Sequence, residues 1–191
     1  MRVELNAFEE RYRDVADPWD FVTSPYENRK YDITVAELPR ARYRRCFEPG
    51  CAVGALTARL ASVCDEVVAQ EASASALATA RTNLDRSTAE PSNVSLVHGA
   101  VPETWPAGTF DLVVFSELGY YWDEPALIEI VDRVWSLVES GGDLIAVHWR
   151  GHSPDHLLSG DVVHDILRRR LGPSLVHHIE SDFVLDVWSA L

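Results

Sequence analysis

From residue 43 onward, short apolar runs alternate with stretches of helical spacing, and this alternation constrains the fold more than any other feature. Five runs are typical of strands, at 43–48, 65–70, 94–98, 111–116 and 143–149, with helices expected between them near 52–62, 75–85 and 124–139. Strands that alternate with helices need right-handed crossovers. The sequence therefore predicts a parallel sheet with helices packed on it.

The two ends of the chain depart from this alternation. A helical pattern at 161–171 is followed by two β-rich runs, 174–180 and 183–189, which predict a terminal hairpin carrying an antiparallel strand. At the other end, helices are expected at 4–14 and 24–38, and the second begins with the capping box S-P-Y-E.

Length and composition fit one globular domain, residues 1–191, with N-terminal lid helices over 1–40 and the core over 41–191. Apolar residues make up 47% of the chain and charged residues 25%. Seventeen basic residues against 30 acidic ones give a net charge of −13, which repels phosphate backbones and anionic lipid. We therefore expect a small-molecule ligand, with no nucleic acid and no membrane partner.

Three cysteines are present, at 46, 51 and 64, and they form no CxxC pair, so neither a disulfide framework nor a zinc knuckle is indicated. The N-terminal residues mix charged and apolar positions, unlike a signal peptide, and the longest apolar runs are only strand-sized. A cytoplasmic location is expected.

A glycine-containing turn follows the first predicted strand. Gly50 and Gly54 let backbone N–H groups approach a ligand beside the positive end of the next helix. Alone, the pattern fits equally well a tight strand-to-helix turn without a ligand. Glu71 ends the second strand, 21 residues beyond Gly50, where doubly wound folds place an acid that binds ribose hydroxyls. The alternative for Glu71 is a helix-capping or solvated acid.

The strand at 111–116 ends in a second polar group. Ser116, Glu117, Tyr120 and Tyr121 follow its carboxyl end, where open α/β sheets bind ligands. The two adjacent tyrosines are either core residues or the wall of a pocket for a substrate or a cation.

These motifs resemble the class I S-adenosylmethionine-dependent methyltransferases. The resemblance rests on the E-x-G-x-x-x-G turn, the acid ending the second strand, the FDLVVFSE strand and the GG-D-L turn. Within that superfamily, DPWDFVTSPYENRKYD followed by FEPGCAVGALTARLA is similar to the nodulation protein S group. The fold implied is a Rossmann-like, doubly wound, mostly parallel seven-stranded α/β sheet with a C-terminal antiparallel hairpin and N-terminal lid helices.

The resemblance also implies an activity and partners. Members of the group N-methylate the deacetylated glucosamine end of a chito-oligosaccharide, with S-adenosyl-L-methionine as cofactor and S-adenosyl-L-homocysteine as product. The implied acceptor is a small molecule, an amino sugar or oligosaccharide. Related domains are joined to, or encoded beside, sugar deacetylases, which implies a functional association with such an enzyme.

By motif position, the resemblance assigns a set of residues to the cofactor. These residues would line the methionine moiety, the ribose, the adenine and the sulfonium side of the cofactor, or cover it. They are Glu48, Gly50, Cys51, Gly54, Glu71, Ala72, Gly99, Ala100, Val101, Ser116, Glu117, Leu118, Tyr26 and Arg29. At two positions this sequence departs from the family's motifs. Ala52 stands at the middle of the glycine motif, and Ala100 replaces an acid that many relatives carry.

Candidate catalytic residues are Glu117, Tyr120 and His148, and candidate substrate contacts are Tyr120, Tyr121, Trp149 and Arg150. For an amine acceptor, Glu117 would attract the ammonium form. For a hydroxyl acceptor, His148 is the expected base, unless it is only a packed strand-end histidine. The rival functions are therefore O-methylation of a sugar or natural-product hydroxyl and a non-catalytic cofactor-binding module.

His148, His152 and His156 recur every fourth residue, as metal ligands on one helix would. Gly151 and Pro154 interrupt any helix there, so the sequence predicts no metal site and instead a loop that forms part of a substrate lid.

Overall fold

The computed structural model describes residues 2–86 and 93–191. By their contacts the residues divide into two units. We call residues 4–36 and 40–106 the N-terminal unit, and residues 107–191 with the short pieces 1–3 and 37–39 the C-terminal unit.

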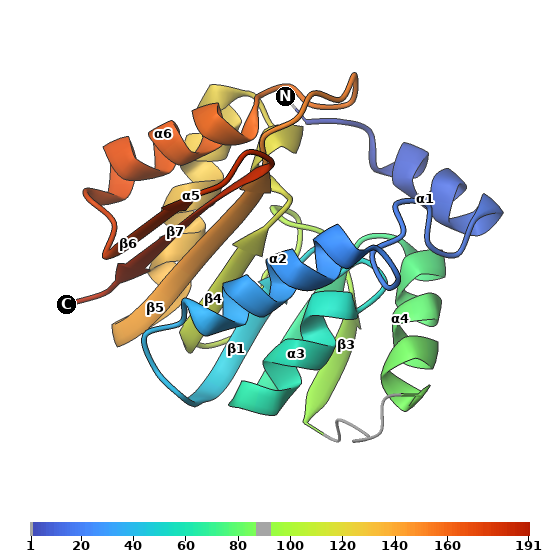
Figure 1. The fold of residues 1–191 in the computed structure, drawn as a ribbon, viewed down its shortest axis with the longest axis horizontal. Coiled ribbons are helices and arrows are strands. Elements are labelled where there is room, and N and C mark those ends of the chain that lie inside the picture. The colour runs from blue at the N-terminus through green and yellow to red at the C-terminus, as the bar shows by residue number, and fades with distance from the viewer. Residues whose placement is uncertain (1, 87–92) are drawn as a thin grey trace. The chain divides into compact units, whose positions relative to one another are not determined.

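The N-terminal unit is a three-stranded parallel sheet with helices on it (Figure 1). Its elements are α1 (Leu5–Asp14), α2 (Pro25–Ala36), β1 (Tyr43–Pro49), α3 (Ala55–Val63), β2 (Cys64–Glu71), α4 (Ala74–Arg86) and β3 (Val94–His98). Strand β2 pairs with β1 on one side and β3 on the other. Helix α3 packs on β1 and β2, α4 packs on β2 and β3, α2 packs on α3, and α1 packs on α4.

The C-terminal unit combines a parallel pair with an antiparallel hairpin. Its elements are β4 (Phe110–Ser116), the 3₁₀ helix η1 (Gly119–Tyr121), α5 (Glu124–Leu137), β5 (Val138–Trp149), α6 (Gly160–Leu171), β6 (Val176–Ile179) and β7 (Phe183–Ser189). Strands β4 and β5 are parallel, whereas β7 runs antiparallel to both β5 and β6. Helices α5 and α6 pack on each other, and α6 also packs on β5 and β7.

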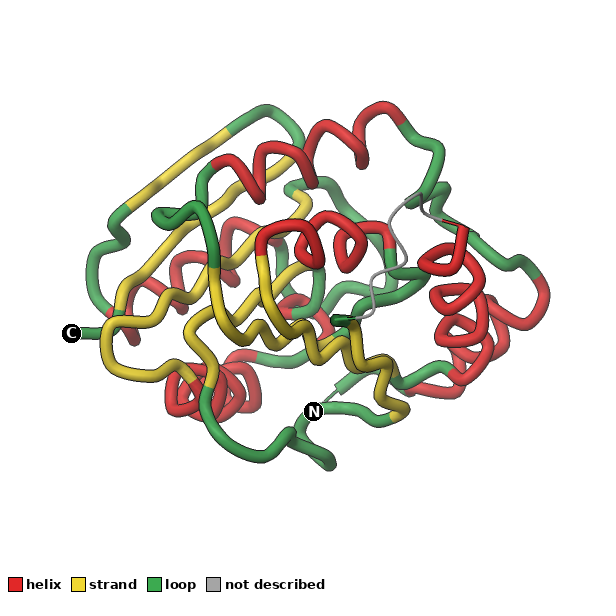
Figure 2. Tube along the Cα trace, turned by 90° about the horizontal axis from the view of Figure 1, so that it is seen from below, coloured by secondary structure: helices red, strands yellow, loops and turns green. Residues whose placement is uncertain are grey.

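The strand order is β3-β2-β1-β4-β5-β7-β6, and Figure 2 shows the alternation of strands and helices along the chain. This order confirms the Rossmann-like, doubly wound, seven-stranded fold and the terminal antiparallel hairpin. The central strands are buried on both faces, as parallel strands between helical layers are. Every residue from Phe110 to Phe115 is buried, as is every residue from Gly142 to His148.

Two helix starts are capped by side chains, the first of them as the capping box predicts. The Glu27 N–H donates to Ser24 Oγ at 3.4 Å, with Pro25 as the first residue of α2. The Ala126 N–H donates to Asp123 Oδ1 at 3.2 Å, at the start of α5.

Two predicted boundaries are wrong. The helix expected from residue 52 begins only at Ala55, because Ala52 and Gly54 have the left-handed backbone of a turn. The helix expected to reach residue 139 ends at Leu137. Val138 pairs with Phe110, and Gly141 and Gly142 lie in β5, where the register with β4 shifts.

Among the described residues, no helix combines the length and the apolar character needed to cross a lipid bilayer.

Candidate functional site

The turn between β1 and α3 has three residues in the left-handed region. Gly50, Ala52 and Gly54 have φ values of 73°, 49° and 79°. A Cβ on Gly54 would lie 3.2 Å from the Cβ of Ala80 on α4, so glycine allows α3 to start this close to α4. Ala52 adopts the same region at a cost that glycine avoids. Backbone strain of this kind is typical of functional sites.

Glu71, the last residue of β2, contacts this turn through its carboxylate. Its Oε2 accepts a hydrogen bond from the Ala52 N–H at 2.9 Å, and its Oε1 accepts one from the Ser73 N–H at 2.8 Å. Burial raises the pKa of Glu71, although these hydrogen bonds oppose the rise. Each carboxylate oxygen has two lone pairs. Both can therefore accept a further hydrogen bond, as two neighbouring hydroxyl groups of a ligand would require.

Glu48, in β1, is a second buried acid of the N-terminal unit. Burial raises its pKa to about 8; the Thr57 hydroxyl, which donates to Oε2 at 2.6 Å, opposes this, and the charge of Glu71 adds to it. The neighbouring Cys51 is also buried, and burial, with the charges of Glu48 and Glu71, raises its pKa well above the usual value. At neutral pH Glu48 is therefore mostly protonated and Cys51 is a thiol.

The remaining candidates of this unit lie on its loops and on α2. The Gly99 N–H donates to the Glu71 carbonyl oxygen at 3.0 Å, which places the 99–101 segment beside the end of β2. The Ala72 carbonyl oxygen is 2.9 Å from His98 Nε2. On α2, Tyr26 is half-buried, with the Lys30 ammonium 5.1 Å from its ring centroid, while Arg29 is exposed.

The Glu9 side chain links helix α1 to the start of α4. The Glu9 carboxylate accepts hydrogen bonds from the Ser73 hydroxyl at 2.6 Å and from the Ser75 hydroxyl at 2.7 Å. The Ser75 N–H also donates to it, at 3.2 Å. These bonds lower the pKa of Glu9 to about 2. Glu9 therefore caps a helix that follows it by more than sixty residues.

The N-terminal segment also packs on the glycine-containing turn. Tyr12 of α1 forms a buried cluster with Val53 of the turn and Ala76 of α4, and Phe8 and Phe21 pack against this cluster. Helix α1 and the segment that follows it thus pack on the turn and on α4.

In the C-terminal unit, Glu117 follows β4 in a left-handed conformation, with φ at 54°. Its N–H donates to the Val147 carbonyl oxygen at 2.9 Å, so the chain turns sharply at the end of the strand. Its carboxylate accepts a hydrogen bond from the Tyr120 hydroxyl and another from the Trp149 N–H, the latter at 3.0 Å. Glu117 is half-buried, and both contacts fix its orientation.

Aromatic rings surround this carboxylate. The His156 ring stacks on Tyr120 with 3.7 Å between centroids, and Tyr121 and Trp149 meet the His156 ring edge-on. Burial lowers the pKa of His156, although the charge of Glu117 opposes this. The Leu157 N–H donates to the Tyr120 carbonyl oxygen at 2.8 Å. The loop after β5 thus packs on η1, and its role as part of a substrate lid stays a prediction.

His148 and Arg150 have contacts within the fold. His148 is fully buried, and its Nε2 accepts a hydrogen bond from the Gly119 N–H at 2.9 Å. Its Nδ1 is 3.1 Å from His164 Nε2. Arg150 donates to Asp161 at 2.8 Å and to the Glu180 carbonyl oxygen at 2.6 Å. Over residues 2–86 and 93–191, no group of three or more His, Cys, Asp or Glu residues could hold a metal ion.

Thr57, Glu9 and Asp186 were not predicted from the sequence as parts of these arrangements. Thr57 follows Glu48 by nine residues, but its contact with Glu48 depends on how the turn places α3. Glu9 and Asp186 meet partners 64 and 22 residues away, at Ser73 and His164, and no local spacing signals those contacts.

The fold defines the class of protein to which the chain is similar: it is the α/β fold of the S-adenosylmethionine-dependent methyltransferases. The N-methyltransferase NodS from Bradyrhizobium japonicum WM9, solved in complex with S-adenosyl-L-homocysteine, matches with a TM-score of 0.80 and 22% identity over 97% of this chain and 98% of that one. A candidate methyltransferase from Pseudomonas syringae is 44% identical, with a TM-score of 0.74, over 86% of this chain and 98% of that one.

The family model for nodulation protein S (NodS) matches residues 3–178, and the chain belongs to this family. Nodulation protein S of Rhizobium tropici is 26% identical over 131 residues, which cover 68% of this chain and 53% of that protein. The chain spans about half to two thirds of the length of the curated relatives that it matches. The resemblance expected from the sequence is confirmed at the level of the family.

Proposed function

We propose that this chain is an S-adenosylmethionine-dependent N-methyltransferase whose acceptor is the amine of a small molecule, an amino sugar or glycan. The observation that carries the proposal is the buried Glu71 carboxylate, held by the left-handed turn that follows β1. Family membership and the methyltransferase fold support it.

The residues of the N-terminal unit fit the proposed cofactor. Glu71 offers two hydrogen-bond acceptors to the ribose hydroxyls. Glu48 would lie near the methionine ammonium, which favours ionisation of this protonated acid. The turn has only small side chains at Gly50, Ala52 and Gly54, so backbone groups are open to close approach. Helices α1 and α2 would cover the ligand and exclude water.

The C-terminal unit supplies the proposed acceptor side. A bound cofactor would provide a methyl group on a sulfonium, an excellent leaving group, so the protein mainly has to orient the acceptor and exclude water. Glu117 attracts the acceptor as its ammonium ion, which loses a proton to water before the nitrogen attacks the methyl group. The Tyr120 and Tyr121 rings favour positive charge nearby.

The contacts of His148 favour an amine acceptor over a hydroxyl acceptor. A hydroxyl needs a base that removes its proton during attack. In His148, the expected base, Nε2 already accepts the Gly119 N–H and Nδ1 faces His164. Glu117 is the acidic group at the end of β4. Because a carboxylate attracts an ammonium ion, it favours an amine acceptor. A functional link with a sugar deacetylase follows from this proposal, because deacetylation produces the free amine that the enzyme would methylate.

The cofactor proposal is tested by calorimetric titration with S-adenosyl-L-homocysteine. Glu71→Ala removes charge-assisted hydrogen bonds worth about 1.5–3 kcal/mol each, so binding should weaken at least about tenfold. Asp65→Ala is the matched control, since Asp65 is an exposed acid at the other end of β2, paired with Arg42. Absence of binding by the wild type at millimolar ligand, or equal affinity of wild type and Glu71→Ala, would contradict the proposal. Binding without methyl transfer to any amine or hydroxyl acceptor would instead support a non-catalytic module.

A further inference from the structure

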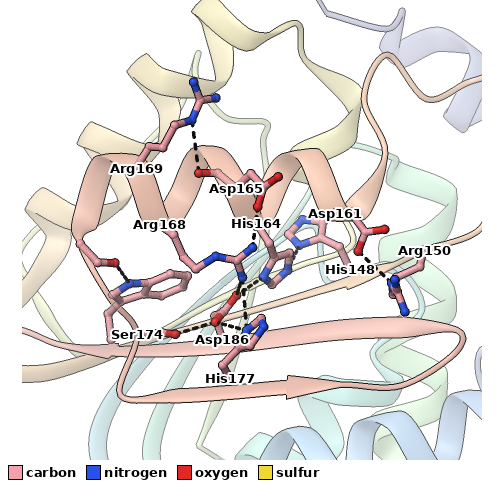
Figure 3. Close-up of polar contacts among 12 residues, drawn as sticks. His148, Arg150, Asp161, His164, Asp165, Arg168, Arg169, Ser174, His177 and Asp186 are labelled. Carbon is pink, nitrogen blue, oxygen red and sulfur yellow. Dashed lines mark hydrogen bonds and ion pairs between the residues drawn. The ribbon is translucent and has the colours of Figure 1, made fainter.

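A chain of buried polar side chains crosses three elements of the C-terminal unit (Figure 3). His148 from β5, His164 from α6 and Asp186 from β7 each have no exposed surface. His148 Nδ1 lies 3.1 Å from His164 Nε2, and His164 Nδ1 lies 2.6 Å from Asp186 Oδ2. At its inner end, the chain meets the backbone N–H of Gly119.

The Gly119 N–H fixes the direction of every hydrogen bond in this chain. A backbone N–H only donates, so His148 Nε2 is an acceptor and carries no proton. The proton of His148 is then on Nδ1 and is donated to His164 Nε2. His164 in turn carries its proton on Nδ1 and donates it to the Asp186 carboxylate. Both histidines are neutral in this arrangement, and each has one defined tautomer.

At the outer end of this row of side chains, neighbouring groups balance the negative charge of Asp186. The Asp186 carboxylate also accepts from Arg168 at 2.8 Å, from Ser174 at 2.6 Å and from His177 Nδ1 at 2.7 Å. Burial raises the pKa of Asp186, but the hydrogen bonds from His164 and Ser174 outweigh burial and leave it below its usual value. Burial lowers the pKa of His164; the hydrogen bond to Asp186 and its charge oppose this, and the charge of Arg168 adds to the lowering. Arg168 thus balances the negative charge of Asp186, and the arrangement is consistent with two neutral histidines.

Gly119 and His148 are in close contact. A Cβ on Gly119 would lie 2.5 Å from Val163 Cγ1 and 3.0 Å from His148 Nε2, so this contact requires glycine. Gly119 begins η1, two residues after Glu117, and Tyr120 of the same helix donates to the Glu117 carboxylate. The N–H held by His148 is therefore part of the turn that orients Glu117.

We propose that His148, His164 and Asp186 form a positioning relay, which fixes the 117–121 turn through the Gly119 N–H and thereby holds the Glu117 carboxylate in one orientation. None of the three touches the acceptor in this account; they act through the turn. The assignment of an acceptor to Glu117 rests on the proposed function, whereas the fixed turn and the two tautomers do not.

A pair of substitutions at His148 separates the relay from simple packing. In His148→Gln, the side-chain oxygen can take the place of Nε2 and still accept the Gly119 N–H. In His148→Asn, the amide is placed near the Nδ1 position, so the contact with His164 is kept and the acceptor for Gly119 is lost. Asparagine is one methylene shorter, so a packing role predicts a loss of protection that is shared by the buried strands of the C-terminal unit and is not concentrated at Gly119.

The measurements are amide hydrogen exchange at Gly119 and steady-state kinetics of the full chain. The relay predicts that His148→Asn speeds Gly119 exchange by at least about tenfold over His148→Gln. The same variant should lower kcat by about tenfold or more relative to His148→Gln, with KM for S-adenosylmethionine nearly unchanged, because a misplaced reacting group costs up to about 10²-fold. Exchange at Val68 of β2, in the other unit, checks that both variants remain folded.

Nitrogen-15 NMR of the wild type supplies a test without any substitution. It should show the proton on Nδ1 in both His148 and His164. A proton on His148 Nε2, or equal Gly119 exchange in the two folded variants, would overturn the relay. If exchange and tautomers are as predicted but no acceptor is methylated, the relay stands and the proposed function fails.

Discussion

Replacing Glu48 with glutamine should change how the stability of the protein depends on pH. Glu48 is 3% exposed, and burial raises its pKa from 4.5 to about 8. Glutamine resembles the protonated acid in shape and keeps an oxygen that can accept from the Thr57 hydroxyl. The variant therefore mimics the form of Glu48 that the fold prefers, at every pH.

The magnitude follows from the difference in proton binding between the folded and unfolded chains. Below pH 4.5 the acid is protonated in both states. Between pH 4.5 and about 8 it is ionised only in the unfolded chain, so the folded state binds more protons and the free energy of unfolding falls by about 1.4 kcal/mol per pH unit. From pH 5.5 to 7.5 this amounts to about 2–3 kcal/mol, or a Tm change of about 4–12 °C for a chain of this size. Above about pH 8 the loss is complete.

The assay is urea denaturation of the ligand-free protein at pH 5.5 and pH 7.5, for the wild type and Glu48→Gln. Other titrating groups are common to both proteins, so the difference between them isolates Glu48. The stability of Glu48→Gln relative to wild type should rise by about 2–3 kcal/mol between the two pH values. Thr57→Val should extend the pH-dependent loss to higher pH, because the Thr57 hydroxyl favours the ionised acid. A stability difference that does not change with pH would refute the reasoning.

Two further predictions concern the attachment of α1 and the acceptor side. Hydrogen bonds lower the pKa of Glu9 to about 2. The stability that Glu9 adds to the attachment of α1 is therefore complete above the ordinary pKa of 4.5 and is lost as pH falls toward 2. Hydrogen-exchange protection of the α1 amides should fall over that range in the wild type, whereas Glu9→Gln should have low protection throughout; identical profiles would disprove the attachment. For an amine acceptor, kcat/KM should rise with pH as the free amine forms, and Glu117→Gln should raise KM for the acceptor. A pH-independent kcat/KM, or an unchanged KM in that variant, would count against the role of Glu117.

The order of elements could be predicted because it depends on local patterns. Apolar runs such as 111–116 and the capping box at Ser24 carry their own signal, and the structure has a strand and a helix start at those places. The turn at Gly50 and the acid at Glu71 were also predicted, since chain spacing and strand ends fix where they lie. The structure adds a contact between them, through the Ala52 N–H, and their role in cofactor binding stays a prediction.

The polar contacts inside each unit could not be predicted in the same way. His148 was expected to be a free strand-end base or a packed histidine, and the structure has it fully buried, in contact with Gly119 and His164. Those partners lie 29 and 16 residues away, so their contact depends on the packing of η1 and α6 on β5. Likewise, the helix expected to reach residue 139 ends at Leu137, because pairing of Val138 with Phe110 of β4 begins the strand there.

The most direct test of the proposed function is methyl transfer to paired sugar acceptors. A chito-oligosaccharide with a free amine at its terminal glucosamine and its fully N-acetylated counterpart are each incubated with the protein and methyl-labelled S-adenosylmethionine, and the products are analysed by mass spectrometry. N-acetylation delocalises the nitrogen lone pair, so the account predicts label on the nitrogen of the free-amine sugar and none on the acetylated one. Label on an oxygen atom, or equal labelling of both sugars, would contradict N-methylation.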